Sequence, residues 1–333
     1  MLNAKFPPAF LISLATLDSF PPGEAFGGIT MNEKIYDMLI VGGGPGGYTA
    51  ALYAARAGMS VLVLEKLAAG GQMAETPQID NYPGYTGLDG FTLGQQMKDT
   101  AEHFGAQSRF AEVTKLHLEG KIKSAETTDG TFYGKTLVVA TGAHPRKLNV
   151  PGEQELFGRG VHYCAACDGM FYRGKTVVLV GGGNSAAAEA LHLARLAKKV
   201  ILVHRRDTLR ATKLYHEPLM KLPNLEFRWN SAVSERPGGE RLSGVKIRNL
   251  ISGEEELIEA DGLFVSIGRV PSTALVEGQL ELEDGYIRAD ESTRTSIPGV
   301  FAVGDVRTKA LRQIITAAAD GANAAHFAEE YLA

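Results

Sequence analysis

Residues 36–65 read YDMLIVGGGPGGYTAALYAARAGMSVLVLE. An apolar run ends in a cluster of glycines, an alanine-rich segment follows, and a second apolar run ends at an acid. The pattern predicts a strand over Tyr36–Val41, a helix over Tyr48–Ala57 and a strand over Ser60–Leu64. Strand, glycine turn, helix, strand and acid, in this order, are typical of the βαβ unit that binds a dinucleotide.

Three glycines have separate tasks in such a turn. Gly42 permits the tight turn, Gly44 permits the close approach of a pyrophosphate, and Gly47 permits the packing of helix on strand. The helix N-terminus then offers free N–H groups and its positive end to the phosphates. Glu65 is expected to accept hydrogen bonds from the ribose hydroxyls of FAD or NAD.

A second copy of the pattern begins 139 residues later, where Gly181 takes the place of Gly42. The interval from first glycine to strand end is 23 residues in both copies. One G-x-G-x-x-G motif is a weak signal, whereas two copies in the same context are a strong one. The predicted elements are a strand over Lys175–Val180, the turn Gly181–Ala186, a helix over Ala187–Leu196 and a strand over Lys199–Val203.

The second copy has basic residues where the first has its acid. His204, Arg205 and Arg206 stand at the strand end, and Arg210 follows four residues later. A carboxylate there would repel a 2′-phosphate, whereas guanidinium groups hold it with charge-assisted hydrogen bonds. The cluster therefore predicts NADPH in the second fold, with a solvated basic face as the alternative. A chain that holds both FAD and NADPH is suited to hydride transfer.

Each copy continues into a buried strand that ends in glycine, at Gly142 and at Gly268. We interpret Ala143–Pro151 and Arg269–Thr273 as two crossings between domains. The fold class is α/β, with two three-layer Rossmann-like dinucleotide-binding domains, of which the FAD domain is discontinuous. The expected boundaries are 1–33 for an N-terminal extension, 34–146 with 274–333 for the FAD domain, and 147–273 for the NADPH domain, which carries the cysteines.

Composition narrows the possible functions. The chain of 333 residues carries 34 Lys and Arg against 38 Asp and Glu, and no basic stripe favours nucleic acid. The apolar stretch Phe6–Leu17 has 12 residues, too few to span a bilayer, so we expect no membrane association and a cytoplasmic protein. We expect residues 1–33 to be a disordered extension, or to reflect a start placed too early, since Met31 precedes the first clear strand.

Both cysteines lie in the segment Cys164-Ala165-Ala166-Cys167-Asp168. A zinc site needs about four ligands and only His162 is close by, so we expect no bound metal. A structural disulfide would close too small a loop to add much stability. The third interpretation, a redox dithiol, is favoured by the C-x-x-C spacing.

Taken together, these motifs closely resemble those of low-molecular-weight thioredoxin reductases, over about residues 34–332. The segments that carry the resemblance are Gly42–Tyr48, Gly70-Gly71-Gln72, Asn81-Tyr82-Pro83-Gly84, Ala140-Thr141-Gly142, Cys164–Gly169, Gly181–Ala186, His204–Asp207 with Arg210, and Gly299–Val306 followed by Arg312-Gln313.

The resemblance implies a mechanism. NADPH reduces FAD, the flavin reduces the Cys164–Cys167 disulfide, and the dithiol reduces thioredoxin. It further implies that Cys167 lies next to the flavin, that Cys164 attacks thioredoxin and that Asp168 moves protons. The family is homodimeric and turns one domain against the other during the cycle.

The resemblance also implies two sets of binding residues. The expected FAD-binding residues are Gly42, Gly44, Pro45, Gly46, Gly47, Glu65, Lys66, Gly70, Gly71, Gln72, Asn81, Thr141, Gly142, Gly304, Asp305, Arg312, Gln313 and Ile314. The expected NADPH-binding residues are Gly181, Gly183, Asn184, Ser185, Ala186, His204, Arg205, Arg206 and Arg210.

Three alternatives remain open. A reductase of the same build could act on a peroxidase, another thioredoxin-like carrier or a small disulfide. A relative that takes electrons from ferredoxin is disfavoured by the basic cluster. A protein of another class, a redox sensor that binds FAD without turnover, would not consume NADPH steadily.

Overall fold

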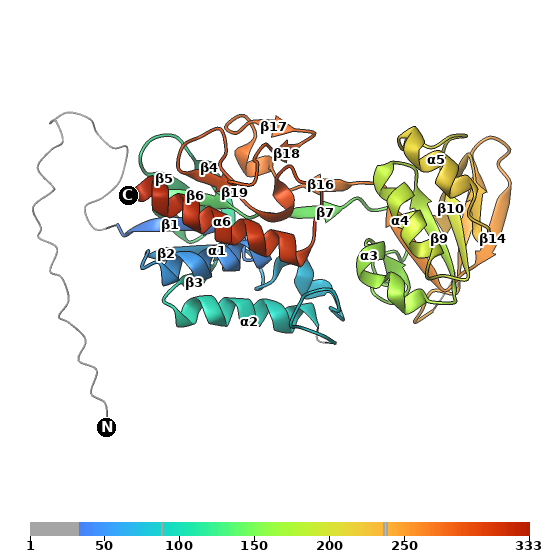
Figure 1. Cartoon of the computed structure of the whole chain (residues 1–333), viewed down its shortest axis with the longest axis horizontal. Helices are drawn as coiled ribbons and strands as arrows, with labels where there is room; N and C mark the ends of the chain where they lie inside the picture. Colours follow the sequence, from blue (N-terminus) through green and yellow to red (C-terminus); the bar gives the residue numbers. More distant parts are fainter. Residues whose placement is uncertain (1–32, 88, 236, 238) are drawn as a thin grey trace, which may run out of the picture. The chain divides into compact units, whose positions relative to one another are not determined.

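The computed structural model of the chain describes residues 33–87, 89–235, 237 and 239–333 (Figure 1). The expected N-terminal extension therefore lies outside the described residues except for Glu33. Residues Ile35–Ala333 form one unit of the structure. In the described part of the chain, every helix is too short or too polar to cross a membrane.

The first glycine turn belongs to a seven-stranded sheet, ordered β3-β2-β1-β6-β5-β4 with β19 paired to β6. Strands β1, β2, β3, β6 and β19 are parallel, whereas β4, β5 and β6 form an antiparallel meander. The bounds are β1 Ile35–Val41, β2 Val61–Glu65, β3 Gln107–Phe110, β4 Val113–His117, β5 Lys123–Thr127, β6 Gly130–Val139 and β19 Val300–Ala302.

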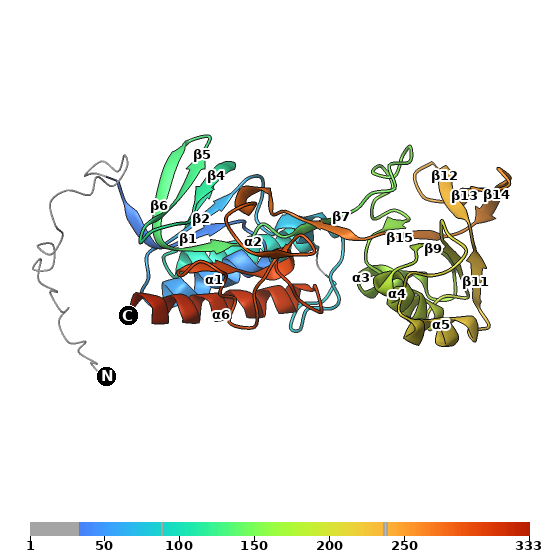
Figure 2. The same cartoon turned by 90° about the horizontal axis from the view of Figure 1, so that it is seen from above.

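Helices α1 (Pro45–Arg56), α2 (Gly90–His103) and α6 (Ile314–Leu332) accompany this sheet. Helices α1 and α6 run side by side in both views (Figure 1, Figure 2). A Cβ added at Gly321 of α6 would lie 2.2 Å from the carbonyl oxygen of Gly46 in α1. The two helices can pack this closely because small residues line the contact.

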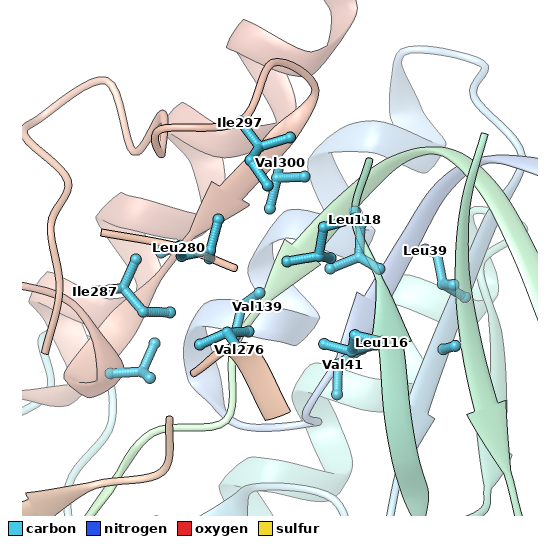
Figure 3. Packing of buried hydrophobic residues seen from close by; sticks show 14 of the residues in the cluster. Leu39, Val41, Leu116, Leu118, Val139, Val276, Leu280, Ile287, Ile297 and Val300 are labelled. Carbon is cyan, nitrogen blue, oxygen red and sulfur yellow. The ribbon is translucent and has the colours of Figure 1, made fainter. Parts of the chain in front are cut away.

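One hydrophobic core joins residues from both ends of the chain (Figure 3). Leu39 and Val139 of the sheet are fully buried together with Val276 and Ile287, which lie far later in the sequence. Burial of side chains of this size contributes about 1.5–3 kcal/mol each. The C-terminal segment is therefore part of the same core as the first glycine-turn sheet.

The second glycine turn belongs to a five-stranded sheet, ordered β11-β10-β9-β15-β8, in which every pairing is parallel. Its strands are β8 Val161–His162, β9 Thr176–Gly181, β10 Lys199–Val203, β11 Leu225–Arg228 and β15 Gly262–Ser266. The helices of this region are α3 Ala165–Asp168, α4 Asn184–Ala194 and α5 Lys213–Met220. An antiparallel meander of β12 Ser231–Glu235, β13 Gly244–Asn249 and β14 Glu255–Glu259 follows.

The structure confirms the α/β class and the repeated strand–helix–strand unit, with shifted ends. Helix α1 begins at Pro45 rather than at Tyr48, because proline suits the first turn of a helix. Strand β6 stops at Val139, before the left-handed Gly142, and β15 likewise stops at Ser266.

The two predicted crossings contain strands that pair with each other. Strands β7 (Ala143–Pro145) and β16 (Arg269–Pro271) form an antiparallel two-stranded ribbon. Strands β17 (Leu282–Glu283) and β18 (Tyr286–Ile287) form another. Short 3-10 helices complete the described elements, namely η1 Gly71–Glu75, η2 Gly169–Tyr172, η3 Ala274–Val276 and η4 Gly304–Val306.

Candidate active site

The first glycine turn connects β1 to α1. A Cβ added at Gly42, whose φ is +109°, would lie 2.3 Å from the carbonyl oxygen of Ala140. A Cβ added at Gly47 would lie 2.0 Å from the carbonyl oxygen of Gly42. At Gly44, by contrast, a Cβ would meet no described atom within 4 Å. Gly44 is the N-cap of α1 and brings no side-chain cap. The start of α1 thus presents N–H groups beside open space, as a pyrophosphate site requires.

Glu65 lies at the end of β2, beside this turn. Its Oε2 accepts a hydrogen bond from the Gly43 N–H at 2.6 Å, and its Oε1 accepts one from the Leu67 N–H at 3.0 Å. A carboxylate offers about four acceptor positions, so capacity for ribose hydroxyls remains. The neighbouring Lys66 instead forms an exposed ion pair with Glu112 at 2.6 Å.

The Gly70–Gln72 segment packs on the first glycine turn. The Gly70 N–H donates to the Gly43 carbonyl at 2.8 Å, and a Cβ at Gly71 would lie 3.4 Å from the Cα of Gly44. The structure thus brings two of the predicted FAD segments together, although 26 residues separate Gly44 from Gly70 in the chain.

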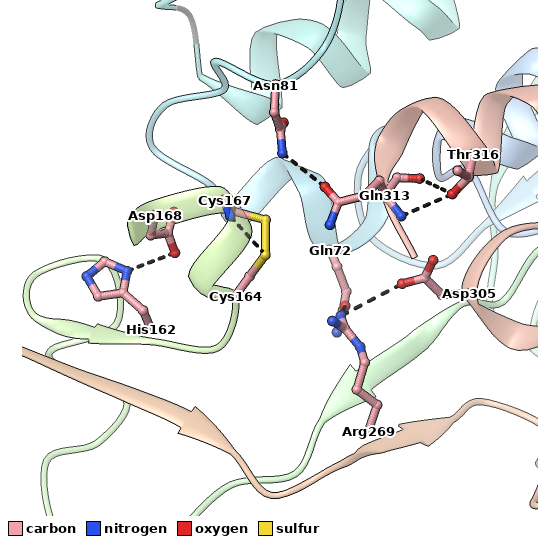
Figure 4. The surroundings of a disulfide bond; sticks show 10 residues. All are labelled: Gln72, Asn81, His162, Cys164, Cys167, Asp168, Arg269, Asp305, Gln313 and Thr316. Carbon is pink, nitrogen blue, oxygen red and sulfur yellow. Dashed lines mark hydrogen bonds and ion pairs between the residues drawn. A yellow bond between two sulfur atoms is a disulfide. The ribbon is translucent and has the colours of Figure 1, made fainter. Parts of the chain in front are cut away.

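Asn81 and Gln313 also meet, across 232 positions of sequence. The Asn81 side-chain amide donates to Gln313 Oε1 at 2.9 Å (Figure 4). Gln313 is the N-cap of α6, and its N–H donates to Thr316 Oγ1 at 3.1 Å. Ile314 is the first residue of α6. These bonds fix the start of α6 against the loop that carries Asn81.

A buried ion cluster holds the segment before α6. Asp320, only 3 % exposed, accepts hydrogen bonds from the Gly304 N–H at 2.8 Å, from Arg307 at 2.6 Å and from Lys309 at 2.7 Å. A paired and fully hydrogen-bonded charge can be buried at tolerable cost. Asp320 therefore positions the predicted FAD residue Gly304.

Asp305 lies next to this cluster and faces two guanidinium groups. Burial raises its pKa, while Arg269 and Arg312 oppose the rise. Arg269 lies 3.8 Å from the Asp305 carboxylate and donates to Gln72 Oε1 at 3.0 Å (Figure 4). Arg269 was not predicted from the sequence as a site residue. Its one signal was a charge at the carboxyl end of a buried strand.

Thr141 and Gly142 connect the two crossings. Thr141 Oγ1 donates to the Ser272 carbonyl at 2.7 Å, and the Ser272 N–H donates to the Gly142 carbonyl at 2.9 Å. Their backbone is thereby fixed next to β7. Their contact with FAD stays a prediction.

The second glycine turn, like the first, has a crowded glycine at the strand end and an open glycine at the helix start. A Cβ at Gly181 would lie 2.3 Å from the Ser266 carbonyl oxygen, whereas a Cβ at Gly183 would meet no described atom within 4 Å. Gly183 is the N-cap of α4 and, like Gly44, brings no side-chain cap. Asn184 Oδ1 accepts a hydrogen bond from the Thr212 N–H at 2.8 Å, which links the turn to α5.

The basic cluster divides into a buried ring and exposed guanidinium groups. His204 is 5 % exposed and lies so close to Gly182 that a Cβ there would come within 2.1 Å of the ring. Burial, with Arg210 nearby, lowers the pKa of His204. Arg205, Arg206 and Arg210 are exposed, and within the described chain none pairs with a carboxylate. They are therefore available to an anionic ligand.

The two cysteines form a disulfide. The sulfurs lie 2.15 Å apart and the Cα atoms 5.3 Å apart (Figure 4). Cys164 is the N-cap of α3, and its sulfur accepts a hydrogen bond from the Cys167 N–H at 3.1 Å. Asp168 follows directly and lies 2.9 Å from Nδ1 of His162. Both cysteine residues are half-buried.

Helix α4 also carries the carboxyl group of Glu189, which was not predicted from the sequence as a site residue. Burial raises the pKa of Glu189 to about 7, while Ser266 and Arg269 oppose the rise. Its Oε2 is buried without a hydrogen-bond partner in the described structure. A lone acid in an alanine-rich helix was the only sequence signal.

Among the described residues, no three His, Cys, Asp or Glu side chains group together as metal ligands. The site combines two helix starts at glycine turns without side-chain caps, a carboxylate beside the first, arginines beside the second, and a disulfide.

Comparisons with known proteins agree with this arrangement. A family described as pyridine nucleotide-disulphide oxidoreductase matches residues 36–321. A thioredoxin reductase of Listeria monocytogenes is 43 % identical over 303 residues, which are 90 % of this chain and 95 % of that protein.

Solved structures agree as well. The thioredoxin reductase of Streptococcus pyogenes has a TM-score of 0.85 at 44 % identity and covers 90 % of this chain and 98 % of its own. The thioredoxin reductase of Lactococcus lactis, in the conformation designated FR, has a TM-score of 0.63 at 41 % identity, covering 89 % of this chain and 99 % of its own. The chain therefore belongs to the pyridine nucleotide-disulphide oxidoreductase family and groups with the thioredoxin reductases in it.

Proposed function

We propose that this chain passes electrons from NADPH, through FAD and the Cys164–Cys167 pair, to oxidised thioredoxin. The observation that carries the proposal is the disulfide itself. It lies in a chain where two helices begin at glycine turns without side-chain caps, one beside a carboxylate and the other beside arginines. The names of its relatives support thioredoxin as the acceptor.

The residues around the first turn fit FAD. Gly44 leaves room at the start of α1, and Glu65 is held beside the turn with acceptor capacity to spare. Bound FAD supplies the ring that takes two electrons from a nicotinamide and gives them to a disulfide. The loops that carry Gln72, Asn81 and Asp305 would orient this ring and its ribityl chain.

The residues around the second turn fit NADPH. Gly183 gives the pyrophosphate room at the start of α4, and Arg205, Arg206 and Arg210 are exposed to hold a 2′-phosphate. Guanidinium groups bind phosphate oxygens through paired, charge-assisted hydrogen bonds. The contributions of Asn184, Ser185, Ala186 and His204 belong to the same proposal.

The disulfide residues divide the work. Cys167 takes electrons from the flavin side, Cys164 attacks the disulfide of thioredoxin, and Asp168 gives and takes the proton that each thiol exchanges. Cys164 is only half-buried as a residue, which suits such an attack.

We propose the domain boundaries 34–146 with 274–333 for FAD, and 147–273 for NADPH. Nicotinamide, disulfide and thioredoxin need the same small region in turn, so one domain has to rotate about the crossings. The solved relatives favour rotation. At nearly equal identity their TM-scores differ, 0.85 against 0.63, which a changed arrangement of similar parts produces.

We further propose a cytoplasmic homodimer. A reversible dithiol suits a reducing compartment. Large apolar side chains are exposed on three helices of the first region, at Tyr53, Phe91 and Ile315, and a second copy would cover such residues.

The experiment is a turnover assay of the purified protein with NADPH and a panel of oxidised thioredoxins, followed at the nicotinamide absorbance. Steady consumption that depends on thioredoxin supports the proposal. The Cys164→Ser variant should keep its flavin reducible by NADPH and lose thioredoxin turnover. Consumption with a small disulfide or a peroxidase instead would favour another reductase of the same build, and no consumption at all would favour a sensor.

A further inference from the structure

His162 is a buried histidine whose two ring nitrogens are both occupied. It ends β8, is 4 % exposed and stacks on Phe264 with ring centroids 5.3 Å apart. Its Nδ1 lies 2.9 Å from Asp168 Oδ2, and its Nε2 lies 2.7 Å from the Tyr172 hydroxyl. Figure 4 shows His162 directed at Asp168, on the strand that leads into the disulfide.

One set of proton positions satisfies all three side chains. Burial, followed by the nearby carboxylate of Asp168, raises the pKa of Tyr172 to about 12, so the hydroxyl keeps its proton. A hydroxyl that donates to Nε2 of His162 leaves the ring proton on Nδ1, where it donates to the carboxylate of Asp168. Every polar atom that joins the three side chains is satisfied in this state.

One additional proton also fits without breaking the chain. It is held either as an imidazolium that donates to both neighbours, or as a carboxylic acid on Asp168 that donates to Nδ1 while Nε2–H donates to Tyr172. The pair of Asp168 and His162 can therefore store one proton beside the disulfide.

We propose that His162 is a positioning residue that holds Asp168 in place and loads it with the one proton that each turnover takes from solvent. This inference rests on the proposed function. Breaking the Cys164–Cys167 bond to two thiols takes two electrons and two protons. The hydride of NADPH brings both electrons and one proton, so the second proton comes from water. Asp168 gives its proton to a sulfur, and His162 returns one to Asp168.

Other charged groups on neighbouring elements face the three hydrogen-bonded side chains of Tyr172, His162 and Asp168. Arg241 precedes β13, Asp261 precedes β15, and both act on Tyr172. The Lys175 ammonium precedes β9 and lies 5.4 Å from the centre of the Tyr172 ring. These groups lie at the phenol end, whereas Asp168 is the charged partner of Nδ1.

The test is His162→Asn, whose amide can donate to Asp168 but cannot take up a proton. Turnover with thioredoxin is measured from pH 5.5 to 9 beside stopped-flow reduction of the flavin by NADPH. Without the imidazole, Asp168 loses the group that returns its proton, so the ratio of parent to variant turnover should grow as the pH rises, to about tenfold at pH 8. Flavin reduction and the KM for NADPH should stay at the parent values.

A second pair of variants separates this role from a merely structural one. In an Asp168→Asn background, His162→Asn should cause no further loss, because His162 acts through Asp168. If His162→Asn does not fold, Tyr172→Phe keeps the packed ring, removes the partner of Nε2 and should move the pH profile in the same direction.

The proposal is wrong if the variant's pH profile superimposes on the parent's, or if turnover drops by the same factor at every pH. Failure of the proposed function has a different signature, namely that the parent itself consumes no NADPH with thioredoxin.

Discussion

Glu189 shows how a single buried carboxyl group links stability to pH. The folded protein raises its pKa to about 7 by burial, whereas the unfolded chain has a value near 4.5. A raised carboxyl pKa means that the folded state binds the proton more tightly, so stability is lost as pH rises from about 4.5 through 7. We expect Glu189→Gln to raise the free energy of unfolding at pH 8 by about 2 kcal/mol.

The measurement is urea or thermal unfolding of parent and variant at pH 5 and pH 8. The two proteins should differ little at pH 5, where the parent side chain is already protonated. An equal gain at both pH values would show that packing, and not ionisation, explains the change.

The arginines of the second turn allow a test of ligand choice. Arg205→Ala with Arg206→Ala should raise the KM for NADPH by about tenfold or more while kcat falls less, because the lost contacts hold the 2′-phosphate in ground state and transition state alike. Arg195→Ala, at the C-cap of α4, removes one positive charge away from this cluster and is the control for loss of charge alone. A parent enzyme that uses NADH and NADPH equally well would contradict the assignment.

Some residues could be predicted from sequence and others could not. Gly42 and Gly181 were predictable because a tight turn at a strand end tolerates almost no other residue. Arg269, Asp320 and the His162–Asp168 contact were not, because each depends on which distant segments the fold brings together. The C-x-x-C spacing favoured a redox dithiol, and the Cys164–Cys167 disulfide followed only from the resemblance to the family.

At the scale of elements, the starts of α1 and α4 each combine an open glycine, where an added Cβ would meet no described atom, with closed glycines, where it would clash. Gly183→Ala adds a methyl group where the described structure has no atom within 4 Å, at a φ of −90° that alanine accepts. We expect an unchanged Tm and a KM for NADPH raised by about tenfold, because the methyl group takes the space of the pyrophosphate.

Gly321→Ala is the structural counterpart. Its methyl group would lie 2.2 Å from the Gly46 carbonyl, so α1 and α6 must separate. Overpacking of this kind costs about 1–3 kcal/mol, and we expect a lowered Tm with NADPH binding retained. Equal losses of Tm in both variants would refute the distinction between open and closed glycines.

Element boundaries were less predictable than the elements. The alanine-rich runs predicted α1 and α4, and the apolar runs predicted the parallel strands around them. The pairing of β7 with β16 was not visible, because three-residue strands give too short a pattern and their pairing is set by the crossings as a whole.

At the scale of the whole molecule, the β7–β16 ribbon is where rotation would be restrained. His144 and Val270 are directly opposite each other in its register. If the proposed domain rotation gates the cycle, a disulfide between His144→Cys and Val270→Cys should slow thioredoxin turnover by about fivefold or more and leave NADPH affinity unchanged.

The two single-cysteine variants are the controls, and alkylation followed by mass measurement gives the fraction cross-linked. Turnover that is the same in the cross-linked protein and in both controls would argue against rotation about these strands.

The most direct test of the account is to count electrons. Under anaerobic conditions, the purified yellow protein is titrated with dithionite and followed by flavin absorbance, in the parent and in Cys164→Ser with Cys167→Ser. We predict that complete reduction takes about four electrons per chain in the parent, two for the flavin and two for the disulfide, and about two in the variant. A requirement of about two electrons in both proteins, or a preparation without flavin, would contradict the central claim that the disulfide and a bound flavin exchange electrons.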